Sequence, residues 1–286
     1  MGNGFARAVH PLSADTRLRR LAVVLRKLSG RIFVAYSGGV DSRFLAHALG
    51  LAGLTPTLLH VVGPHIPDRE SELAEARANR MGLPIRILSI NPLELPEVRA
   101  NSRERCYFCK RALFARLLDE ARAVARGQAV TLCDGSNRSD RQGYRPGLRA
   151  LAELGIRSPL DEAELEKAEI RELAALIGME APDQPSRPCL LTRFAYGVSP
   201  TPDLLARVDA TERAVEEAWQ AEEMPRSLPD FRIRVTGPDW VLQMALPPER
   251  EEPFIAALAA RLEALTLPMP RLIADEAVSG YFDRRV

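Results

Sequence analysis

The chain has 286 residues, with 39 Lys and Arg against 38 Asp and Glu, so its formal net charge is +1. A balance this close to neutral gives no bulk electrostatic reason to bind nucleic acid or a membrane surface. No run of 18 or more apolar residues occurs, and the N-terminal residues lack the apolar segment of a signal peptide. Four cysteines are too few for a disulfide scaffold. We therefore expect a cytoplasmic protein of one large or two modest domains.

Helices and strands are predicted to alternate along the first part of the chain. Apolar residues at helical spacing predict a first helix over residues 13–30, with Ser13 or Asp15 as its N-cap. Four short apolar runs predict buried strands, at residues 32–36, 57–62, 85–90 and 130–134, and the segments between them predict helices, at residues 40–49, 67–81 and 105–125. This rhythm is typical of the α/β class with a doubly wound parallel sheet.

A different pattern begins near residue 229. Strands are predicted at residues 231–237, 240–246 and 272–274, with a helix over 250–265. This pattern indicates a small C-terminal α+β domain. We predict one domain over residues 1–200 and a second, with its linker helix, over residues 201–286.

The most specific motif is the stretch SGGVDS at residues 37–42. It follows a predicted strand and opens a predicted helix, and its adjacent glycines let the backbone fold closely around a phosphate. The first N–H groups and the dipole of the helix attract negative charge. The stretch lacks the spacing and the lysine of a Walker A loop. The candidate phosphate-binding residues are Ser37, Gly38, Gly39, Asp41 and Ser42.

Three cysteines are candidates for chemistry. Cys106 and Cys109 form a CxxC pair that can supply two metal ligands, and Cys189 is the natural third. Cys189 lies between Arg187 and Arg193 in a proline-rich loop, where cations favour the thiolate. The fourth cysteine, Cys133, falls in an apolar strand and is expected to be buried and inert.

Further polar residues are candidates for ligand binding. Asp134, Asn137 and Arg145 lie in and after a strand end where they could hold Mg²⁺, ribose or phosphate. Lys167 lies four residues before Arg171 on a predicted helix, so the two could reach a phosphate or pair with glutamates. Another candidate pair, on one face of a strand, is Arg232 and Arg234.

The order of these motifs resembles the LarE-like family, the sulfur transferases of nickel-pincer nucleotide cofactor synthesis in the PP-loop ATP pyrophosphatase superfamily. The similarity spans residues 20–234 and includes SGGVDS, RCYFCK, DGSN–RPG, SPL, KAEIR, PSRPCL-TRFAYG, Glu212 and RIR. The resemblance implies a PP-loop, adenine nucleotide alpha hydrolase-like fold. It also implies that ATP·Mg²⁺ adenylates a carboxylate of pyridinium-3,5-biscarboxylic acid mononucleotide, with pyrophosphate release, and that Cys189 then expels AMP.

The resemblance also implies roles for single residues. The SGGVDS loop would bind ATP phosphate with Asp41 on Mg²⁺, Arg193, Arg232 and Arg234 would hold substrate phosphate, and Glu212 would lie near the reacting cysteine. Sulfur would come either from Cys189, which becomes dehydroalanine, or from a [4Fe-4S] cluster on three cysteines; the presence of CxxC favours the second route. A homo-oligomer is also implied.

Two features depart from the family pattern. The strand at residues 240–245 lacks the family's metal-binding acid, and the C-terminal motif is reduced to SGYFDRRV. These departures leave the identity of the sulfur acceptor open. Two alternatives to the implied function also remain, a tRNA thiolation enzyme and an ATP-binding module without turnover. The neutral charge and the lack of an RNA-binding stripe argue against the first, and the missing acid favours the second.

Overall fold

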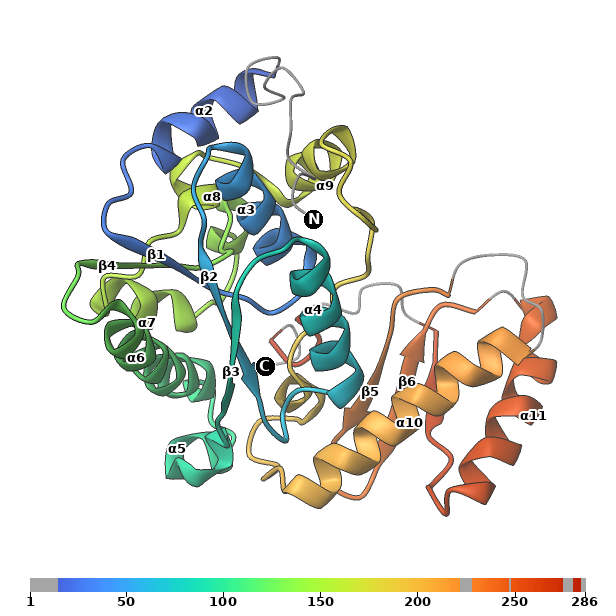
Figure 1. Ribbon diagram of the computed structural model, residues 1–286. Coiled ribbons are helices and arrows are strands. Elements are labelled where there is room, and N and C mark those ends of the chain that lie inside the picture. Colours follow the sequence, from blue (N-terminus) through green and yellow to red (C-terminus); the bar gives the residue numbers. More distant parts are fainter. Residues whose placement is uncertain (1–14, 222–227, 247, 275–279, 284–286) are drawn as a thin grey trace. The chain divides into compact units, whose positions relative to one another are not determined.

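The computed structural model describes residues 15–221, 228–246, 248–274 and 280–283. The chain forms two compact units: residues 1–62, 68–90 and 106–187 make up the first, and residues 63–67, 91–105 and 188–286 the second. The predicted domain boundary at residue 200 stays a prediction; the compact units differ from it by assigning residues 63–67, 91–105 and 188–200 to the second unit. Figure 1 shows both units.

The first unit is a parallel sheet with helices on both faces (Figure 1). Its strands are β1 (Arg31–Ala35), β2 (Thr57–Val62), β3 (Ile85–Ser89) and β4 (Val130–Cys133), in the order β3-β2-β1-β4. The helices are α2 (Thr16–Leu25), α3 (Val40–Leu51), α4 (Asp68–Arg80), α6 (Arg105–Ala125), η2 (Arg138–Arg141), α7 (Gly147–Glu153), α8 (Pro159–Glu162) and α9 (Lys167–Leu176). The predicted α/β class and parallel sheet are confirmed.

The strand order of the sheet reverses at β1. β1 pairs in parallel with β2 on one side and with β4 on the other, with Phe33 opposite Thr57 and Leu132. The chain thus runs outward from β1 to β3 and then returns to the other side of β1. Ligands of parallel α/β sheets bind at the carboxyl ends of the strands where the order reverses in this way. The loops that follow β1 and β4 meet at that point.

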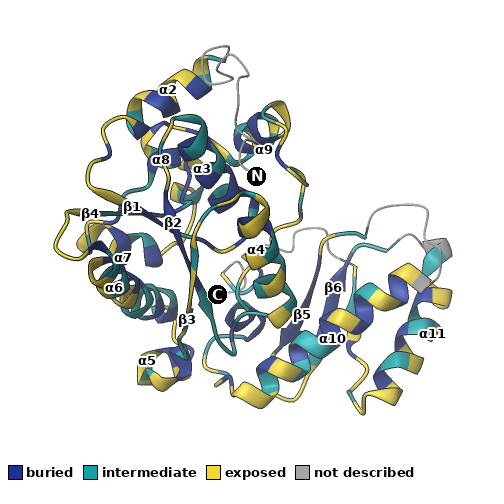
Figure 2. Ribbon diagram, viewed as in Figure 1, coloured by how far each residue is buried: buried dark blue, intermediate teal, exposed yellow. Residues whose placement is uncertain are grey.

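Alternating side chains of β1 divide the apolar core into two layers. Ile32 and Val34 pack in a core with α2, α3, α8 and α9, whereas Phe33 packs with α6 and α7 on the opposite face. Each helix therefore buries one face and exposes the other, as the dark blue and yellow stripes of Figure 2 show. α2 is shorter than predicted, although Asp15 is its N-cap, one of the two predicted; Ser13 lies outside the described residues.

The second unit has a small sheet of its own. The strands β5 (Phe231–Val235) and β6 (Trp240–Met244) pair antiparallel, and β7 (Arg271–Ile273) joins β6 in parallel. The helices and turns are η1 (Pro92–Glu94), α5 (Pro96–Arg99), η3 (Leu190–Arg193), α10 (Pro202–Ala221) and α11 (Pro248–Ala264). Trp219 of α10 packs edge-on against Phe254 of α11, with ring centroids 6.1 Å apart. The α+β pattern predicted from residue 229 onward is confirmed.

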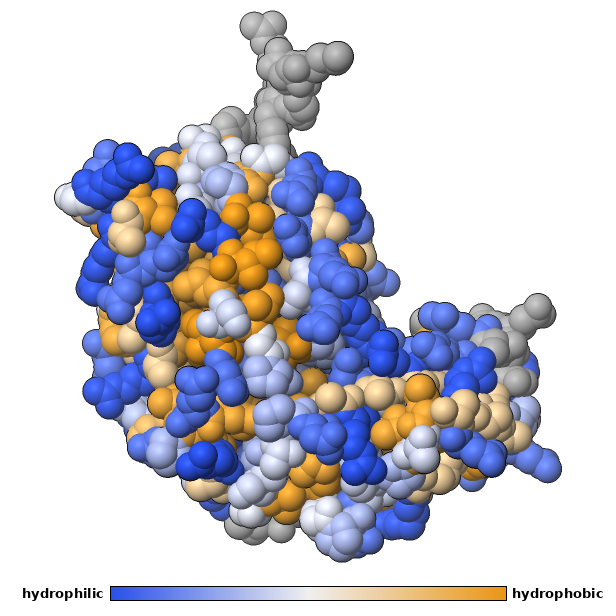
Figure 3. Space-filling model, turned by 60° about the horizontal axis from the view of Figure 1, so that its bottom comes forward, coloured by the Kyte–Doolittle hydropathy of each residue, from blue (hydrophilic) through white to orange (hydrophobic). Residues whose placement is uncertain are grey.

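The molecular surface mixes hydrophilic and hydrophobic side chains, and the face in Figure 3 has a broad hydrophobic area bordered by hydrophilic residues. β3 is the least buried strand of its sheet, with Ile87 48% exposed. It is an edge strand, and such edges are available for further contacts. No described helix combines the length and apolar character that a membrane crossing requires.

Candidate functional site

The loop between β1 and α3 is closed by its own hydroxyl groups. The Ser37 Oγ lies 3.2 Å from the Ser42 Oγ, and the Gly39 N–H donates to the Ser37 Oγ at 3.4 Å. The Ser42 hydroxyl also lies within donating distance of the Gly39 carbonyl, at 3.2 Å. Gly39 is the N-cap of α3, and no side chain caps the first turn of that helix. The first N–H groups of α3 are thus directed at the loop, where an anion would be stabilised.

Two glycines allow close backbone contacts around this loop. Gly38 has φ +78°, and a Cβ there would lie 2.6 Å from the Ala74 Cβ of α4. Gly135, which follows β4, would place a Cβ 2.9 Å from the Ser42 nitrogen. A side chain at Gly38 would be strained by both its φ and its contact. The loop after β4 therefore reaches the N-terminus of α3 without an intervening side chain.

Asp134 supports this loop from inside the protein. The hydroxyls of Ser136 and Ser158 each donate to one of its carboxylate oxygens, and the Asp134 N–H donates to the Arg157 carbonyl at 2.9 Å. Asp134 is buried. Because both carboxylate oxygens already accept hydrogen bonds, we interpret Asp134 as a residue that shapes the strand end rather than as a ligand of Mg²⁺.

Asp41 and Asn137 present buried oxygens that lack partners. The Asp41 Oδ1 and the Asn137 Oδ1 are both buried with no hydrogen-bond partner among the described residues. Burial raises the pKa of Asp41 to about 6, opposed chiefly by the charge of Lys167. Unsatisfied buried oxygens are costly unless a ligand completes them. Two hard oxygen donors of this kind fit Mg²⁺.

Cationic side chains surround the same carboxylate. The charges of Lys167 and Arg171, both on α9, lower the pKa of Asp41, whereas that of Asp140 raises it. The Asp140 carboxylate accepts from the Asn137 N–H at 3.1 Å and lies 3.4 Å from the exposed Arg145 guanidinium. The structure thus brings the predicted residues Asp41, Asn137 and Lys167 to one place, with Arg145 joined to them through Asp140.

In the second unit, Glu212 and Arg193 form a buried ion pair. The Arg193 Nε and Nη2 donate to the two Glu212 oxygens at 2.7 and 3.0 Å, and the Ile233 N–H donates to the same carboxylate at 3.1 Å. Burial alone would raise the pKa of Glu212, but Arg193 holds it below its usual value. Glu212 therefore stays ionised and fully bonded, which suits a positioning role better than proton transfer.

Two more buried arginines lie beside this pair on β5. Arg232 lies opposite Gln243 of β6, and the Arg234 Nε donates to the Gln243 Oε1 at 2.9 Å, which confirms that both arginines share one face. Burial, together with the charges of Arg193 and Arg232, lowers the pKa of Arg234 to about 9. The buried guanidiniums of Arg193, Arg232 and Arg234 are candidate donors of charge-assisted hydrogen bonds to an anionic ligand.

Hydrogen bonds fix the loop that contains Cys189. The Leu190 N–H donates to the His65 carbonyl at 3.0 Å, and the Thr192 N–H and hydroxyl both reach the Cys189 carbonyl. Of the two arginines expected to favour the thiolate, Arg193 pairs with Glu212 and Arg187 with the Glu70 carboxylate at 3.2 Å; their effect on Cys189 stays a prediction.

The CxxC pair and Cys189 belong to different compact units. Cys106 is half-buried and Cys109 buried on α6, whereas Cys189 lies in the second unit. Among the described residues, no group of three or more His, Cys, Asp or Glu side chains could hold a metal ion. A cluster on these three cysteines therefore stays a prediction, and we derive no reaction step from it. Cys133 is fully buried, as predicted, and burial raises its pKa to about 12.

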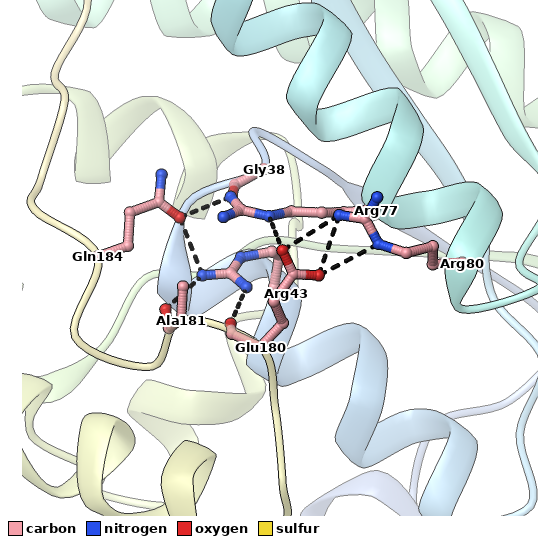
Figure 4. Close-up of polar contacts among 7 residues, drawn as sticks. All are labelled: Gly38, Arg43, Arg77, Arg80, Glu180, Ala181 and Gln184. Atoms are coloured by element: carbon pink, nitrogen blue, oxygen red, sulfur yellow. Dashed lines mark hydrogen bonds and ion pairs between the residues drawn. The ribbon is translucent and has the colours of Figure 1, made fainter.

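Sequence reasoning missed a set of buried arginines beside the loop. Arg43, one residue after SGGVDS, and Arg77 of α4 are both buried and both donate to the Gln184 side chain (Figure 4). A single signal was present in the sequence: Arg43 interrupts an apolar helical run that the sheet must bury.

The fold and this geometry define a parallel α/β protein with a strand–glycine loop–helix motif at the ligand-binding edge of its sheet. None of the family models compared with the chain matches it. Three relatives do match. The uncharacterized protein slr1717 of Synechocystis sp. is 35% identical over 242 residues, which cover 84% of this chain and 85% of the relative.

The other two relatives come from two further organisms. The pyridinium-3,5-bisthiocarboxylic acid mononucleotide synthase of Lactiplantibacillus plantarum is 29% identical over 84% of this chain and 83% of its own. The uncharacterized protein MJ0830 of Methanocaldococcus jannaschii is 32% identical over 64% of this chain and 68% of its own. The chain belongs to the family of these relatives, and the synthase supports its description as LarE-like.

Proposed function

We propose that the chain is an ATP-dependent sulfur transferase that adenylates a carboxylate of a small nucleotide and replaces the carboxylate oxygen with sulfur. The observation that supports this most is the pair of buried, unpartnered oxygens of Asp41 and Asn137 beside the uncapped N-terminus of α3. Such a site suits a cation and the phosphates it neutralises. The name of the Lactiplantibacillus relative suggests the acceptor, a pyridinium-3,5-biscarboxylic acid mononucleotide.

The first step activates the acceptor. A carboxylate oxygen of the acceptor attacks the α-phosphorus of ATP, and the bond to the β-phosphate breaks with release of pyrophosphate. The loop N–H groups, Ser37 and Ser42 would bind the phosphates, with Lys167 as a nearby cation. Mg²⁺, when bound by Asp41 with Asn137, would neutralise charge on the phosphates.

The second step transfers sulfur. The thiolate of Cys189 attacks the adenylated carbonyl carbon, and AMP leaves with the electron pair of the broken C–O bond. When the Cβ–S bond of Cys189 then breaks, with loss of its Cα proton to a base, the product is a thiocarboxylate and the residue becomes dehydroalanine. The buried arginines of the second unit, Arg193, Arg232 and Arg234, would bind the acceptor's phosphate through hydrogen bonds from their guanidinium groups.

The sulfur source remains to be tested as part of this proposal. A [4Fe-4S] cluster on Cys106, Cys109 and Cys189 would supply sulfide in place of the cysteine's own sulfur. Iron analysis of anaerobically purified protein distinguishes the routes, since a cluster gives about four irons per chain. Little iron, together with a loss of about 34 Da from the Cys189 peptide after one turnover, would indicate the sacrificial route.

The two half-reactions can be separated by substitution. We expect Cys189→Ala to release pyrophosphate in the presence of ATP·Mg²⁺ and the mononucleotide but to form no thiocarboxylate, because the adenylate lacks its nucleophile. Cys133→Ala is the matched control and should retain both steps, since Cys133 lies in the core. Pyrophosphate release that requires tRNA would favour tRNA thiolation, and ATP binding without any release would indicate a module without turnover.

A further inference from the structure

Three arginines of the first unit converge on Gln184. The Arg43 Nη2 and the Arg77 Nη1 donate to the same Gln184 Oε1, at 2.9 and 2.7 Å (Figure 4). The Arg171 Nη2 reaches the Gln184 backbone carbonyl at 3.4 Å. These arginines come from α3, α4 and α9. A single glutamine of an irregular segment is thus the common acceptor for three separate helices.

The arginines have little anionic compensation. Arg43 is 2% and Arg77 7% exposed, and the other acceptors of Arg43 are the carbonyls of Glu180 and Ala181. The Glu180 carboxylate is 55% exposed, lies 3.7 Å from the Arg77 Nε and pairs at 2.9 Å with the exposed Arg80. Burial, and then the charge of Arg77, lowers the pKa of Arg43. Buried cations paired with neutral acceptors are stabilised further when an anion binds nearby.

Each arginine is also connected to the glycine loop. The Arg77 Nη1 lies 3.5 Å from the Gly38 carbonyl, and Ala74, one turn earlier on α4, packs against Gly38 itself. Arg43 directly follows the loop on α3, and the charge of Arg171 acts on Asp41. Phosphate bound in the loop would therefore attract all three guanidiniums and strengthen their shared arrangement around Gln184.

The same glutamine begins the segment that leads to Cys189. Gln184 precedes Cys189 by five residues, and the intervening sequence is Pro185-Ser-Arg-Pro188. Two prolines fix φ along this short segment, so that an anchor at its start restricts its end. The Gln184 N–H also donates to the Ala181 carbonyl at 3.3 Å, which closes a turn at the anchor.

We propose that Gln184 is a positioning residue, which ties residues 180–188 to the phosphate loop so that nucleotide binding orders the segment leading to Cys189. This inference rests on the proposed function, because it requires that the loop bind a nucleotide. Gln184 touches neither substrate nor the reacting atoms in this scheme. Its contacts couple nucleotide binding in the loop to the order of the residues that precede Cys189.

The test uses the full chain with Mg²⁺ and α,β-methylene ATP, which cannot be cleaved between its α- and β-phosphates. Hydrogen exchange of the peptide covering residues 180–188 is measured with and without this analogue, for the wild type, Gln184→Ala, Gln184→Glu and the exposed control Gln128→Ala. We expect the analogue to slow exchange in the wild type and the control by at least about fivefold, the lower end of typical coupling between sites.

The two Gln184 variants should change the hydrogen exchange of residues 180–188 in opposite directions. Gln184→Ala should bind the analogue within about threefold of the wild type but lose the slowing, since its affinity determinants are intact. Gln184→Glu places a carboxylate between Arg43 and Arg77, so its segment should exchange slowly even without the analogue. A merely structural role for Gln184 does not predict this second behaviour.

The outcomes separate the two proposals. A wild type that does not bind the analogue overturns the proposed function and this inference with it. If the wild type binds but Gln184→Ala shows the same slowing, the inference alone is overturned. Loss of analogue binding in Gln184→Ala by more than about tenfold would instead make Gln184 part of the binding site and would also overturn its positioning role.

Discussion

Asp41→Asn is predicted to stabilise the ligand-free protein while removing its response to Mg²⁺ and ATP. The folded-state pKa of Asp41 is raised from 3.8 to about 6, mainly by burial. When the folded-state pKa is raised, the group's contribution to stability is complete at pH values below its unfolded-state pKa. That contribution is lost as the pH rises through its folded-state pKa. The ionised carboxylate therefore destabilises the ligand-free fold at neutral pH, and asparagine cannot ionise.

The size of the effect follows from the shift. At about 1.36 kcal/mol per pKa unit, the raised pKa of Asp41 lowers the free energy of unfolding by about 3 kcal/mol at pH 8. At pH 5, where Asp41 is largely protonated in the folded protein but largely ionised in the unfolded chain, it lowers the free energy of unfolding by about 1.6 kcal/mol. The advantage of Asp41→Asn in free energy of unfolding should thus grow by about 1.4 kcal/mol between these pH values.

Urea unfolding of the ligand-free wild type and variant, at both pH values and in EDTA, measures this difference. Asp119→Asn, at an exposed position of α6, is the control and should show no pH-dependent gain. A difference between Asp41→Asn and the wild type that is constant or shrinks with pH would refute the reasoning. In a second arm at pH 8, ATP·Mg²⁺ should raise the unfolding midpoint of the wild type but not that of Asp41→Asn, because the variant lacks the cation ligand.

Two further substitutions test the loop and the buried ion pair. Gly38→Ala should abolish the stabilisation of the protein by ATP·Mg²⁺. It should also lower the thermal stability more than Gly53→Ala does, because Gly53 has the same φ of +78° but open space around its Cβ position. Equal losses in thermal unfolding would show that the contact with Ala74 is unimportant. Glu212→Ala leaves the buried Arg193 unpaired and should lower the free energy of unfolding by about 3–5 kcal/mol, as measured in urea; a loss below about 1 kcal/mol would mean that the pair is not structural.

Local features of the fold were predictable because their causes are local. Apolar runs marked all four strands of the parallel sheet, and the cap at Asp15 was one of the two predicted. The first helix ends early because, after Leu25, the Lys27 and Leu28 N–H groups bond three residues back, in turns that lead to Gly30 with φ +72°. The apolar spacing continues through these turns because Leu28 is still buried. Periodicity alone therefore predicted a helix that was too long.

The polar contacts of the site could not be predicted, because they join residues that are distant in sequence. Arg43 and Gln184 are separated by 141 positions, and Arg77 and Gln184 by 107. The same holds for the pairing of Arg187 with Glu70. A sequence pattern identifies which side chains are charged, whereas their partners follow from the packing of whole helices.

The division of the chain into two units bears on the proposed positioning role of Gln184. The phosphate loop, Asp41 and Asn137 lie in the first unit, whereas Cys189 and the buried arginines Arg193, Arg232 and Arg234 lie in the second. The chain passes between the units at residues 62–63, 67–68, 90–91, 105–106 and 187–188, and the last two of these crossings lie next to Cys106 and Cys189. An adenylated carboxylate is consumed productively only if the thiol meets it before water does. Because the thiol lies outside the unit that would bind the nucleotide, we expect its timing to depend in part on the chain that leads to it, and residues 180–188 are the part of that chain that the loop's arginines contact.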